Sequence, residues 1–482
     1  MWQVVINIPL VLFTLLSPDG GIRNDINYTA QPATTQIAQY PSKMDSVNGS
    51  RSTLKALVIY SPTSYFMYRG KIMGFEYELL ERLAKNLKME LEVIVCNDVD
   101  SLIPYLQQGK ADIIAHGLTI TPQRKEKVSF TDKLFECQPV LIQRKPNNWR
   151  QLTQNQLDDK LIRSSNQLVG DTISIRKNSS YKERIDSLNN KLGNKFYINL
   201  LDGSYSTDKI IDMVNEEDIK YTIADDYKAK ILTAFTPSLD INTPLSSKQK
   251  IAWAVRKESK NLLNSLNREL RQAKKKVDYY VIFNKYFKNR SYFKQRIKSP
   301  FYSLSNNQIS EYDDLIKQSA DRIGWDWRLL ASLIYQESRF NPEAQSWAGA
   351  KGLMQMMPET AKMLGLEDAA NPEKNIIAGS TYLQKIYNRF KNISDENQRI
   401  KFTLASYNSG YGHILDAQRL AKANGKDPNT WDDSVDMMIL ALQNPEIYHK
   451  PEVRYGYAMG KETYNYVSEI YQRYGHYSFF IK

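Results

Sequence analysis

The sequence has few residues of the types that bind metals. It contains only two cysteines, Cys96 and Cys137, and four scattered histidines among its 482 residues. Two cysteines cannot form a disulfide framework, and no cysteine or histidine cluster has the spacing of a metal site. We therefore expect no metal and no cofactor. The two thiols are expected to be free and buried, with one bridge in an oxidising compartment as the alternative.

Long apolar runs are also absent, and the mean hydropathy of −0.52 excludes a polytopic membrane protein. The apolar run at residues 1–16 is shorter than the roughly 20 residues that a membrane span needs. It resembles the core of a secretory signal, although no Lys or Arg precedes it. Polar residues dominate from there to residue 52. We interpret residues 1–52 as a signal-like segment with a flexible leader, and we expect export.

Acidic residues are outnumbered, with 53 Asp and Glu against 65 Lys and Arg, which gives a net charge of +12. A basic surface suits nucleic acid, an anionic membrane face or an anionic polymer such as a cell wall. The sequence contains no zinc finger, RNP-like or helix-turn-helix signature, so nucleic acid is not expected as a partner. The chain length predicts two or three domains.

Strands alternate with helices through residues 53–290. The pattern predicts a strand at 54–60, a helix at 75–88 and a strand at 91–96, followed by a further helix and strand. Alternation at this spacing is typical of an α/β fold with mainly parallel sheets.

Two stretches of this domain, GFEYELLERLAKNL and SLIPYLQQGKADIIAHGLTITPQRKEKVSFTDKLF, resemble the amino-acid-binding type of periplasmic solute-binding proteins. The resemblance continues through LVGDTISIRKNSSYKERIDSL and YTIADDYKAKIL. It implies two α/β lobes joined by a hinge, with a ligand in the cleft between them. One lobe would comprise residues 53–143 and the return after Pro244.

The same resemblance implies a site for an amino acid-like or muropeptide ligand. Arg124 can hold a carboxylate with two hydrogen bonds, and Asp225 matches the position that pairs with the ligand's amine. The other expected contacts are Thr119, Thr121, Ser179 and Ser180. His116 departs from the small residues that are usual in this family. Alternatively, Arg124 caps a helix or pairs with Glu126 on the surface.

Residues 291–302 are expected to be a linker to a second domain. The segment before and within it, residues 271–298, is rich in Lys and Arg interleaved with Tyr and Phe. Such a basic amphipathic segment can lie on an anionic membrane. We prefer the interpretation that it forms the last helices of the binding domain with a solvated basic face.

Residues 303–482 are predicted to be all helical, and one helix carries a carboxylate on its apolar side. Asp326 can cap a helix that begins near Trp327. Glu337 falls on the same side as Leu330 and Leu333. Burial there disfavours the charged form and raises the pKa, which suits a general acid near neutral pH. A core carboxylate neutralised by a partner is the alternative.

Four motifs follow in order: ES at Glu337, GLMQ, ASYNSG and ETYNYV. Together with NIIAGSTYLQ they are similar to the soluble-lytic-transglycosylase type of lysozyme-like domain. Its combination with a solute-binding domain is similar to a family of membrane-bound lytic murein transglycosylases. This implies cleavage of the MurNAc-GlcNAc bond of peptidoglycan with a 1,6-anhydro product. It also implies a periplasmic location with peripheral outer-membrane attachment.

In that family pattern, one carboxylate does the work of the usual pair, and Glu337 is the catalytic residue. Residues at the matching motif positions would bind the substrate: Ser338, Met354, Gln355, Tyr407, Asn408 and Tyr466. Tyr466 would donate a hydrogen bond to the catalytic carboxyl. Met356-Met357 and Tyr464 depart from the pattern. A lysozyme-like hydrolase, or a solute receptor with a catalytically silent wall-docking domain, remains as an alternative.

Overall fold

The first half of the described chain is built on two main β-sheets. The computed structural model describes residues 53–481 except 97, 204 and 305, so the expected signal-like segment and leader lie outside the described residues. The first sheet has the order β4-β1-β5-β13-β6, with β7 paired to β13. Its strands are β1 (Thr53–Ile59), β4 (Glu90–Cys96), β5 (Ile113–Thr119), β6 (Ser129–Phe130), β7 (Phe135–Cys137) and β13 (Gln249–Val255).

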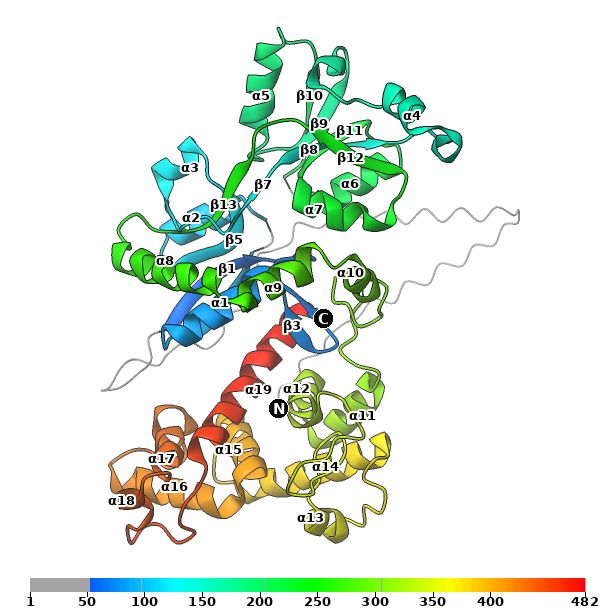
Figure 1. Ribbon diagram of the computed structural model, residues 1–482. Coiled ribbons are helices and arrows are strands. Elements are labelled where there is room, and N and C mark those ends of the chain that lie inside the picture. The colour runs from blue at the N-terminus through cyan, green and yellow to red at the C-terminus, as the bar shows by residue number, and fades with distance from the viewer. Residues whose placement is uncertain (1–52, 97, 204, 305, 482) are drawn as a thin grey trace, which may run out of the picture. The chain divides into compact units, whose positions relative to one another are not determined.

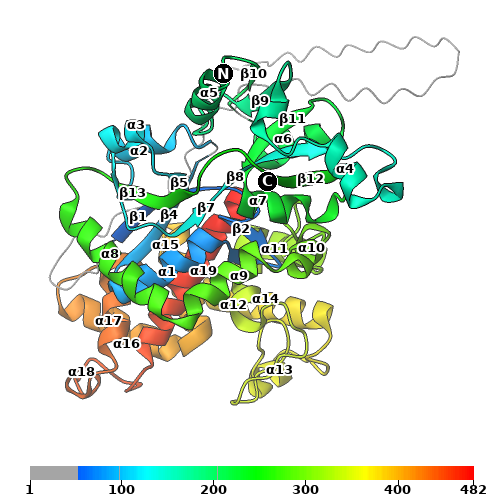
Figure 2. The same cartoon turned by 45° about the horizontal axis from the view of Figure 1, so that its top comes forward.

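The predicted strands at 54–60 and 91–96 are confirmed as β1 and β4, which pair in parallel. The helices of this lobe are α1 (Phe75–Asn86), α2 (Leu102–Gln107), α3 (Pro122–Lys127), α8 (Lys260–Lys275) and α9 (Val277–Phe287). Helices α8 and α9 pack beside α1 (Figure 2). Helix α1 starts directly after Gly74, where a Cβ would lie 1.8 Å from the Ser64 carbonyl oxygen. Only glycine fits this position.

The second sheet has the order β10-β9-β11-β8-β12 (Figure 1). Its strands are β8 (Pro139–Arg144), β9 (Thr172–Arg176), β10 (Tyr197–Leu201), β11 (Tyr221–Asp225) and β12 (Leu239–Pro244). The surrounding helices are α4 (Gln154–Lys160), α5 (Lys182–Lys191), α6 (Thr207–Asn215) and α7 (Asp226–Leu232), with the short 3-10 turns η1 (Trp149–Gln151), η2 (Ser165–Leu168) and η3 (Thr233–Phe235).

Two expectations for the lobes need correction. The first lobe was expected to extend to Gln143, but β8 pairs with β11 and β12, so the chain crosses to the second lobe near Gln138. The sheets are also less parallel than expected, because β8 and β12 run antiparallel to their neighbours, as does β13 in the first sheet.

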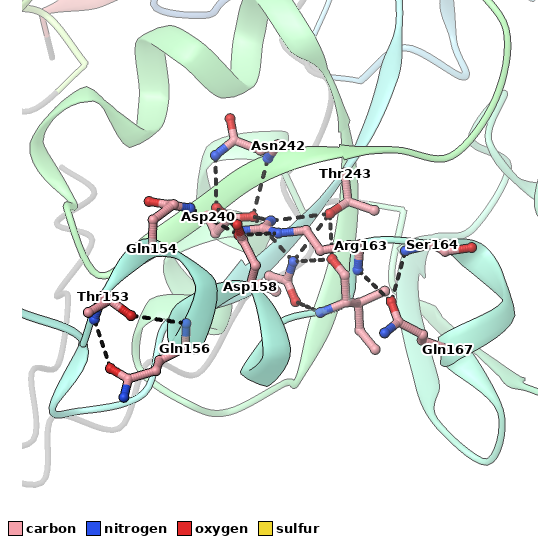
Figure 3. Close-up of polar contacts among 12 residues, drawn as sticks. Thr153, Gln154, Gln156, Asp158, Arg163, Ser164, Gln167, Asp240, Asn242 and Thr243 are labelled. Atoms are coloured by element: carbon pink, nitrogen blue, oxygen red, sulfur yellow. Dashed lines mark hydrogen bonds and ion pairs between the residues drawn. The ribbon is translucent and has the colours of Figure 1, made fainter.

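A partly buried ion pair joins two segments of the second lobe (Figure 3). The guanidinium of Arg163 donates to both carboxylate oxygens of Asp240, at 2.6 and 3.2 Å, and to Asp158 at 2.8 Å. Asp240 is almost fully buried. A buried carboxylate needs such partners, because an unpaired charge in the interior is costly. This pair fastens the strand β12 to the segment that follows α4.

The expected linker is itself structured. Helix α10 (Arg290–Ile297) fills most of residues 291–302. The hairpin of β2 (Phe66–Tyr68) and β3 (Lys71–Met73) pairs with the segment that follows α10, through a bridge between Tyr68 and Tyr302. The fully buried Arg296 guanidinium lies 4.8 Å from the centre of the Phe66 ring, a cation–π distance.

The prediction of an all-helical second domain is confirmed for the described residues up to 481. Its helices are α11 (Asp313–Ile323), α12 (Trp327–Ser338), α13 (Pro358–Met363), α14 (Pro372–Arg389), α15 (Glu396–Ser409), α16 (Tyr411–Ala423), η4 (Trp431–Val435), α17 (Asp436–Ala441), α18 (Pro445–Tyr448) and α19 (Gly460–Phe480). Helix α19 is the longest of these helices, with 21 residues. It packs against α12, α15 and α17.

Cys96 and Cys137 are free and buried, as preferred from the sequence. Within the described part of the chain, no helix combines the length and the apolar character that a membrane crossing requires. The basic segment 271–298 forms the end of α8 and the whole of α9 and α10, in line with the preferred interpretation.

Candidate functional site

Glu337 lies in the last turn of α12, where the sequence placed it. The Asp326 side chain accepts a hydrogen bond from the Arg328 amide and caps the helix. Leu330, Leu333 and Ile334 are completely buried. Burial raises the pKa of Glu337 to about 7, although a hydrogen bond from Tyr466 opposes this shift and the nearby charge of Glu462 adds to it. A carboxyl with this pKa is half protonated near neutral pH, as a general acid requires.

Tyr466 on α19 donates a hydrogen bond to Oε1 of Glu337, which confirms the expected contact. Burial and the Glu337 charge hold the pKa of Tyr466 well above 10, so its hydroxyl remains a donor. A second bond fixes the register of the two helices, because Ser332 Oγ donates to the Ile470 carbonyl at 2.7 Å. The acid and its donor are therefore held by two packed helices.

The GLMQ loop is shaped by Gly352 and Asn375. Gly352 has φ +83°, and a Cβ there would lie 2.1 Å from the Ala369 carbonyl oxygen. The fully buried Asn375 accepts from the Met354 amide at 2.8 Å and donates to the carbonyls of Lys351 and Ala369 at 3.1 and 2.8 Å. One side chain of α14 thus connects the GLMQ loop at Lys351 and Met354 to the segment before α14 at Ala369.

Three of the residues predicted to bind substrate, Gln355, Met354 and Ser338, are buried or hydrogen-bonded within the protein. Gln355 donates to the carbonyls of Ala344 and Gly352, both at 2.9 Å, and its φ is +46°. Met354 is completely buried. Ser338 is buried too, and its hydroxyl donates back to the Ile334 carbonyl at 3.2 Å. These contacts place all three in the framework of the site, and their contact with substrate stays a prediction.

Tyr407 and Asn408 lie at the end of α15. The Tyr407 hydroxyl donates to the Met354 carbonyl at 2.7 Å. Burial and the charge of Glu337 raise the pKa of Tyr407, which places this ring near the acid. Asn408 Oδ1 accepts from the Thr463 hydroxyl at 2.9 Å. The GLMQ loop, the SYNSG motif and the ETYNYV helix therefore meet around Glu337.

A second site lies between the two lobes of the first domain, in a cavity of about 180 Å³. Five of the six predicted ligand contacts line it: Thr119, Arg124, Ser179, Ser180 and Asp225. Thr121 is not among the lining residues, and it caps α3 by accepting from the Arg124 amide. The lining also includes His116, Arg176, Lys228, Asp98 and Asp208.

The cavity presents charges of both signs. Arg124 donates one hydrogen bond to the Thr119 carbonyl at 3.1 Å. Asp225 is almost fully buried, and its Oδ1 has no hydrogen-bond partner within the described residues. Burial and the neighbouring Lys228 and Arg124 hold the pKa of His116 well below its ordinary value, so this imidazole is neutral. The arrangement can take a zwitterion, with a carboxylate at Arg124 and an amine at Asp225. Among the described residues, no cluster of His, Cys, Asp and Glu could hold a metal ion.

Comparison with known proteins covers both domains. Residues 56–289 match the bacterial extracellular solute-binding proteins, family 3, and residues 314–430 match the transglycosylase SLT domain. A membrane-bound lytic murein transglycosylase F of Desulfosudis oleivorans is 34% identical over 89% of this chain and 91% of its own length. The chain belongs to this transglycosylase F family. A member from Shewanella sediminis is 31% identical over 88% of this chain and 84% of its own length.

Solved structures match the binding domain of this transglycosylase F family member. An ancestral arginine-binding protein bound to arginine is 24% identical, with a TM-score of 0.41, and covers 49% of this chain and 99% of its own. An ancestral amino acid-binding protein, a precursor of cyclohexadienyl dehydratase, is 25% identical with a TM-score of 0.40, over 49% of this chain and 96% of its own.

The sequence did not single out several residues that the structure brings into these sites. Glu462 and Thr463 stand within the ETYNYV motif, and their spacing from Tyr466 on one helix could have indicated their proximity. Asn375 lies within NIIAGSTYLQ, but its bonds to a loop some 20 residues earlier leave no local signal. Arg176 is the last residue of β9 and Lys228 lies in the first turn after β11, at the strand ends where α/β sheets place ligand contacts.

Proposed function

We propose that the protein cleaves the β-1,4 bond between N-acetylmuramic acid and N-acetylglucosamine in peptidoglycan, and that the reaction closes a 1,6-anhydro ring on the muramoyl residue. The observation that carries this proposal is Glu337, a carboxyl with a pKa of about 7 that accepts a hydrogen bond from Tyr466 among four converging motifs. Membership of the transglycosylase F family supports the same reaction class.

In the proposed reaction, protonated Glu337 donates its proton to the glycosidic oxygen as the bond from that oxygen to muramoyl C1 breaks. The N-acetyl group of the muramoyl residue stabilises the positive charge at C1. The C6 hydroxyl then attacks C1, and its proton passes to the Glu337 carboxylate, which restores the acid. The C6 oxygen takes the place that water has in a hydrolase, so no water is consumed.

A lysozyme-like hydrolase is the second candidate, and Glu462 favours it. Two carboxylates usually flank the bond in glycoside hydrolysis. Glu462 is close enough for its charge to raise the pKa of Glu337. If it activated water, it would be the second carboxylate. In the lyase, the charge of Glu462 would only raise the pKa of Glu337.

Digestion of purified peptidoglycan with product analysis by mass spectrometry separates the two candidates. A lyase gives anhydro muropeptides, each lighter by one water than the reducing-end product of a hydrolase. We expect anhydro products from the wild type and at least about a thousandfold loss in Glu337→Gln. Glu462→Gln should retain most activity. Reducing-end products that disappear in Glu462→Gln would establish the hydrolase. Complete inactivity of the wild type with intact wall binding would favour a silent docking domain.

For the first domain we infer a ligand with an α-amino acid group, free or at the end of a muropeptide. The support is two opposite charges that line one cavity between the lobes, the half-buried Arg124 and the buried Asp225. Calorimetry with amino acids and purified muropeptides tests this. Arg124→Ala and Asp225→Asn should each abolish the heat, whereas Arg150→Ala, on the exposed surface, should preserve it. Heat that persists in both cavity variants would contradict the site.

We further propose that the bound ligand changes the rate of peptidoglycan cleavage, since both sites lie on one chain. The experiment compares the rate of peptidoglycan digestion with and without a ligand that calorimetry has identified. It is done for the wild type and for Arg124→Ala. A change in the wild type alone would support coupling. Equal rates with bound ligand would mean binding without regulation.

We also propose that the protein works in the periplasm and attaches peripherally to the outer membrane. Relatives carry the name membrane-bound, and the basic surface suits both anionic lipid and cell wall. Fractionation of cells on a density gradient would place the protein. Recovery in the cytoplasm would contradict the proposal.

A further inference from the structure

Helix α9 exposes an apolar strip. Val277, Tyr280 and Val281 are 75, 55 and 56% exposed. Their spacing of three and four residues puts them on one side of the helix. The opposite side is buried against the first lobe through Tyr279, Ile282, Tyr286 and Phe287. The outer strip is therefore not a by-product of a loosely packed helix, because the same helix is firmly seated.

Cations stand at both ends of this strip, which we call the α9 face. Lys275 and Lys276 are exposed directly before the helix, and the exposed Lys288 follows at its C-terminus, with its ammonium 5.8 Å from the centre of the Phe283 ring. The acid in this stretch, Asp278, pairs with Arg82 at 3.0 Å. Residues 271–298 contain ten Lys and Arg against that one acid. The apolar strip thus lies between positive charges.

We propose that the α9 face is the surface through which the protein contacts an anionic lipid bilayer. The proposal deepens the peripheral membrane attachment proposed above and names the face that makes it. The apolar side chains would enter the boundary between headgroups and acyl chains, and the lysines would reach the lipid phosphates. Charge complementarity selects this occupant, since a purely apolar partner would leave the lysines unpaired and a purely anionic one would leave the strip exposed.

A local probe tests the contact in the full chain. Val281→Cys can be labelled selectively with an environment-sensitive fluorophore, because Cys96 and Cys137 are buried. Vesicles of phosphatidylethanolamine and phosphatidylglycerol should shift the emission to the blue and raise its intensity about threefold or more. The matched control is Val169→Cys, at an apolar site that is 57% exposed on the second lobe, and it should not respond.

Vesicle co-sedimentation gives the second readout. Combining Val277→Ser, Tyr280→Ser and Val281→Ser should weaken binding to the same vesicles about tenfold. The double variant Lys275→Glu, Lys276→Glu should also weaken vesicle binding. The loss should be larger at low salt than at high salt, because salt screens exposed charges. The control combines Val169→Ser and Tyr197→Ser, also exposed, and should bind like the wild type. Unchanged peptidoglycan cleavage in all variants would show that they fold.

Several outcomes would overturn the proposal. A silent probe at residue 281 on a protein that still co-sediments would assign attachment to another part of the chain. Equal binding to phosphatidylcholine vesicles would remove the charge argument. If the fluorophore at residue 281 responded instead to lipid-free peptidoglycan or to another protein, the α9 face would be assigned to that partner. Reducing-end products in the digestion experiment would overturn the lyase proposal but leave these results unaffected, so the two proposals can fail separately.

Discussion

The hydroxyl of Tyr466 lowers the pKa of Glu337 against the larger effect of burial. Tyr466→Phe removes this bond, so the pKa of the carboxyl should rise. A hydrogen bond to a charged group contributes about 1.5–3 kcal/mol, and one pKa unit corresponds to about 1.4 kcal/mol. We expect the alkaline limb of the pH–rate profile to move up by about one unit, with a lower maximal rate because the acid is less well oriented.

The control for this prediction is Tyr382→Phe. The Tyr382 ring packs on Tyr407, 5.7 Å away, so it tests the loss of a nearby hydroxyl without removing the bond to Glu337. Its profile should keep the wild-type alkaline limb. A Tyr466→Phe enzyme with an unmoved limb would show that Glu337 does not set the pH dependence.

Glu337 also carries a prediction for stability. Its folded pKa of about 7 lies above the ordinary value of 4.5, so the unfolded chain loses this proton first as pH rises. The stability of the wild type should therefore fall between pH about 4.5 and 7. Glu337→Gln lacks this ionisation. Urea unfolding should give similar free energies at pH about 4 and a variant more stable by on the order of 2 kcal/mol at pH about 8.

At the scale of elements, Gly352 determines the shape of the GLMQ loop. Gly352→Ala places a Cβ in the left-handed region and against the Ala369 carbonyl. We expect a loss of several kcal/mol in unfolding free energy and nearly complete loss of cleavage. Gly425→Ala is the matched control, because its φ is +72° but no atom lies within 4 Å of the new Cβ. It should cost only about 1 kcal/mol. Equal losses in the two variants would contradict the steric argument.

Asp416 fastens the loop between α18 and α19. This completely buried carboxylate accepts from the amides of Arg454 and Tyr455 at 2.8 and 2.7 Å and pairs with Arg419. Asp416→Ala leaves these donors without an acceptor, which costs about 3–5 kcal/mol. Limited trypsin digestion should then cut at Arg454 far faster than in the wild type. Asp427→Ala, in an exposed turn, should leave the cutting rate unchanged.

The elements that the sequence predicted well are those with local signals. Asp326 caps α12, and the apolar run of β1 forms a buried strand, because capping and apolar periodicity act within a few residues. The lobe boundary at Gln143 was wrong for the opposite reason. The apolar strand β8 could fit either sheet, and pairing with β11, some 80 residues later, decides its place.

The candidate sites show the same division. Glu337 was predicted from its position on the apolar side of its own helix, which is a local signal. Tyr466 was predicted from the resemblance to the family motifs. The bond of Asn375 to the Met354 amide, 21 residues earlier, and the charge of Glu462 near Glu337 depend on tertiary packing. In the cleft, Thr121 was predicted from the motif alone, and the structure uses it as a helix cap.

At the scale of the whole molecule, one hydrophobic core includes residues from both domains, from Leu54 to Ile481. The hairpin of β2 and β3 contributes at its tip. Arg69 and Gly70 both have positive φ, which is the geometry of a type I′ turn. The Gly70 carbonyl accepts from the Tyr477 hydroxyl of α19 at 2.8 Å. Shared burial of this kind couples the stability of the two domains.

We therefore expect calorimetry of the wild type to show a single unfolding transition, and Gly70→Ala to separate it into two. A Cβ at Gly70 would lie 2.7 Å from both Phe340 and the Tyr477 hydroxyl, so these two side chains of the catalytic domain must move away from the hairpin. Overpacking of this kind costs about 1–3 kcal/mol. Gly109→Ala is the control, since its φ of +73° carries the same backbone strain with no atom within 4 Å. Two transitions in the wild type would mean that the domains unfold independently. One unchanged transition in Gly70→Ala would mean that this contact does not couple them.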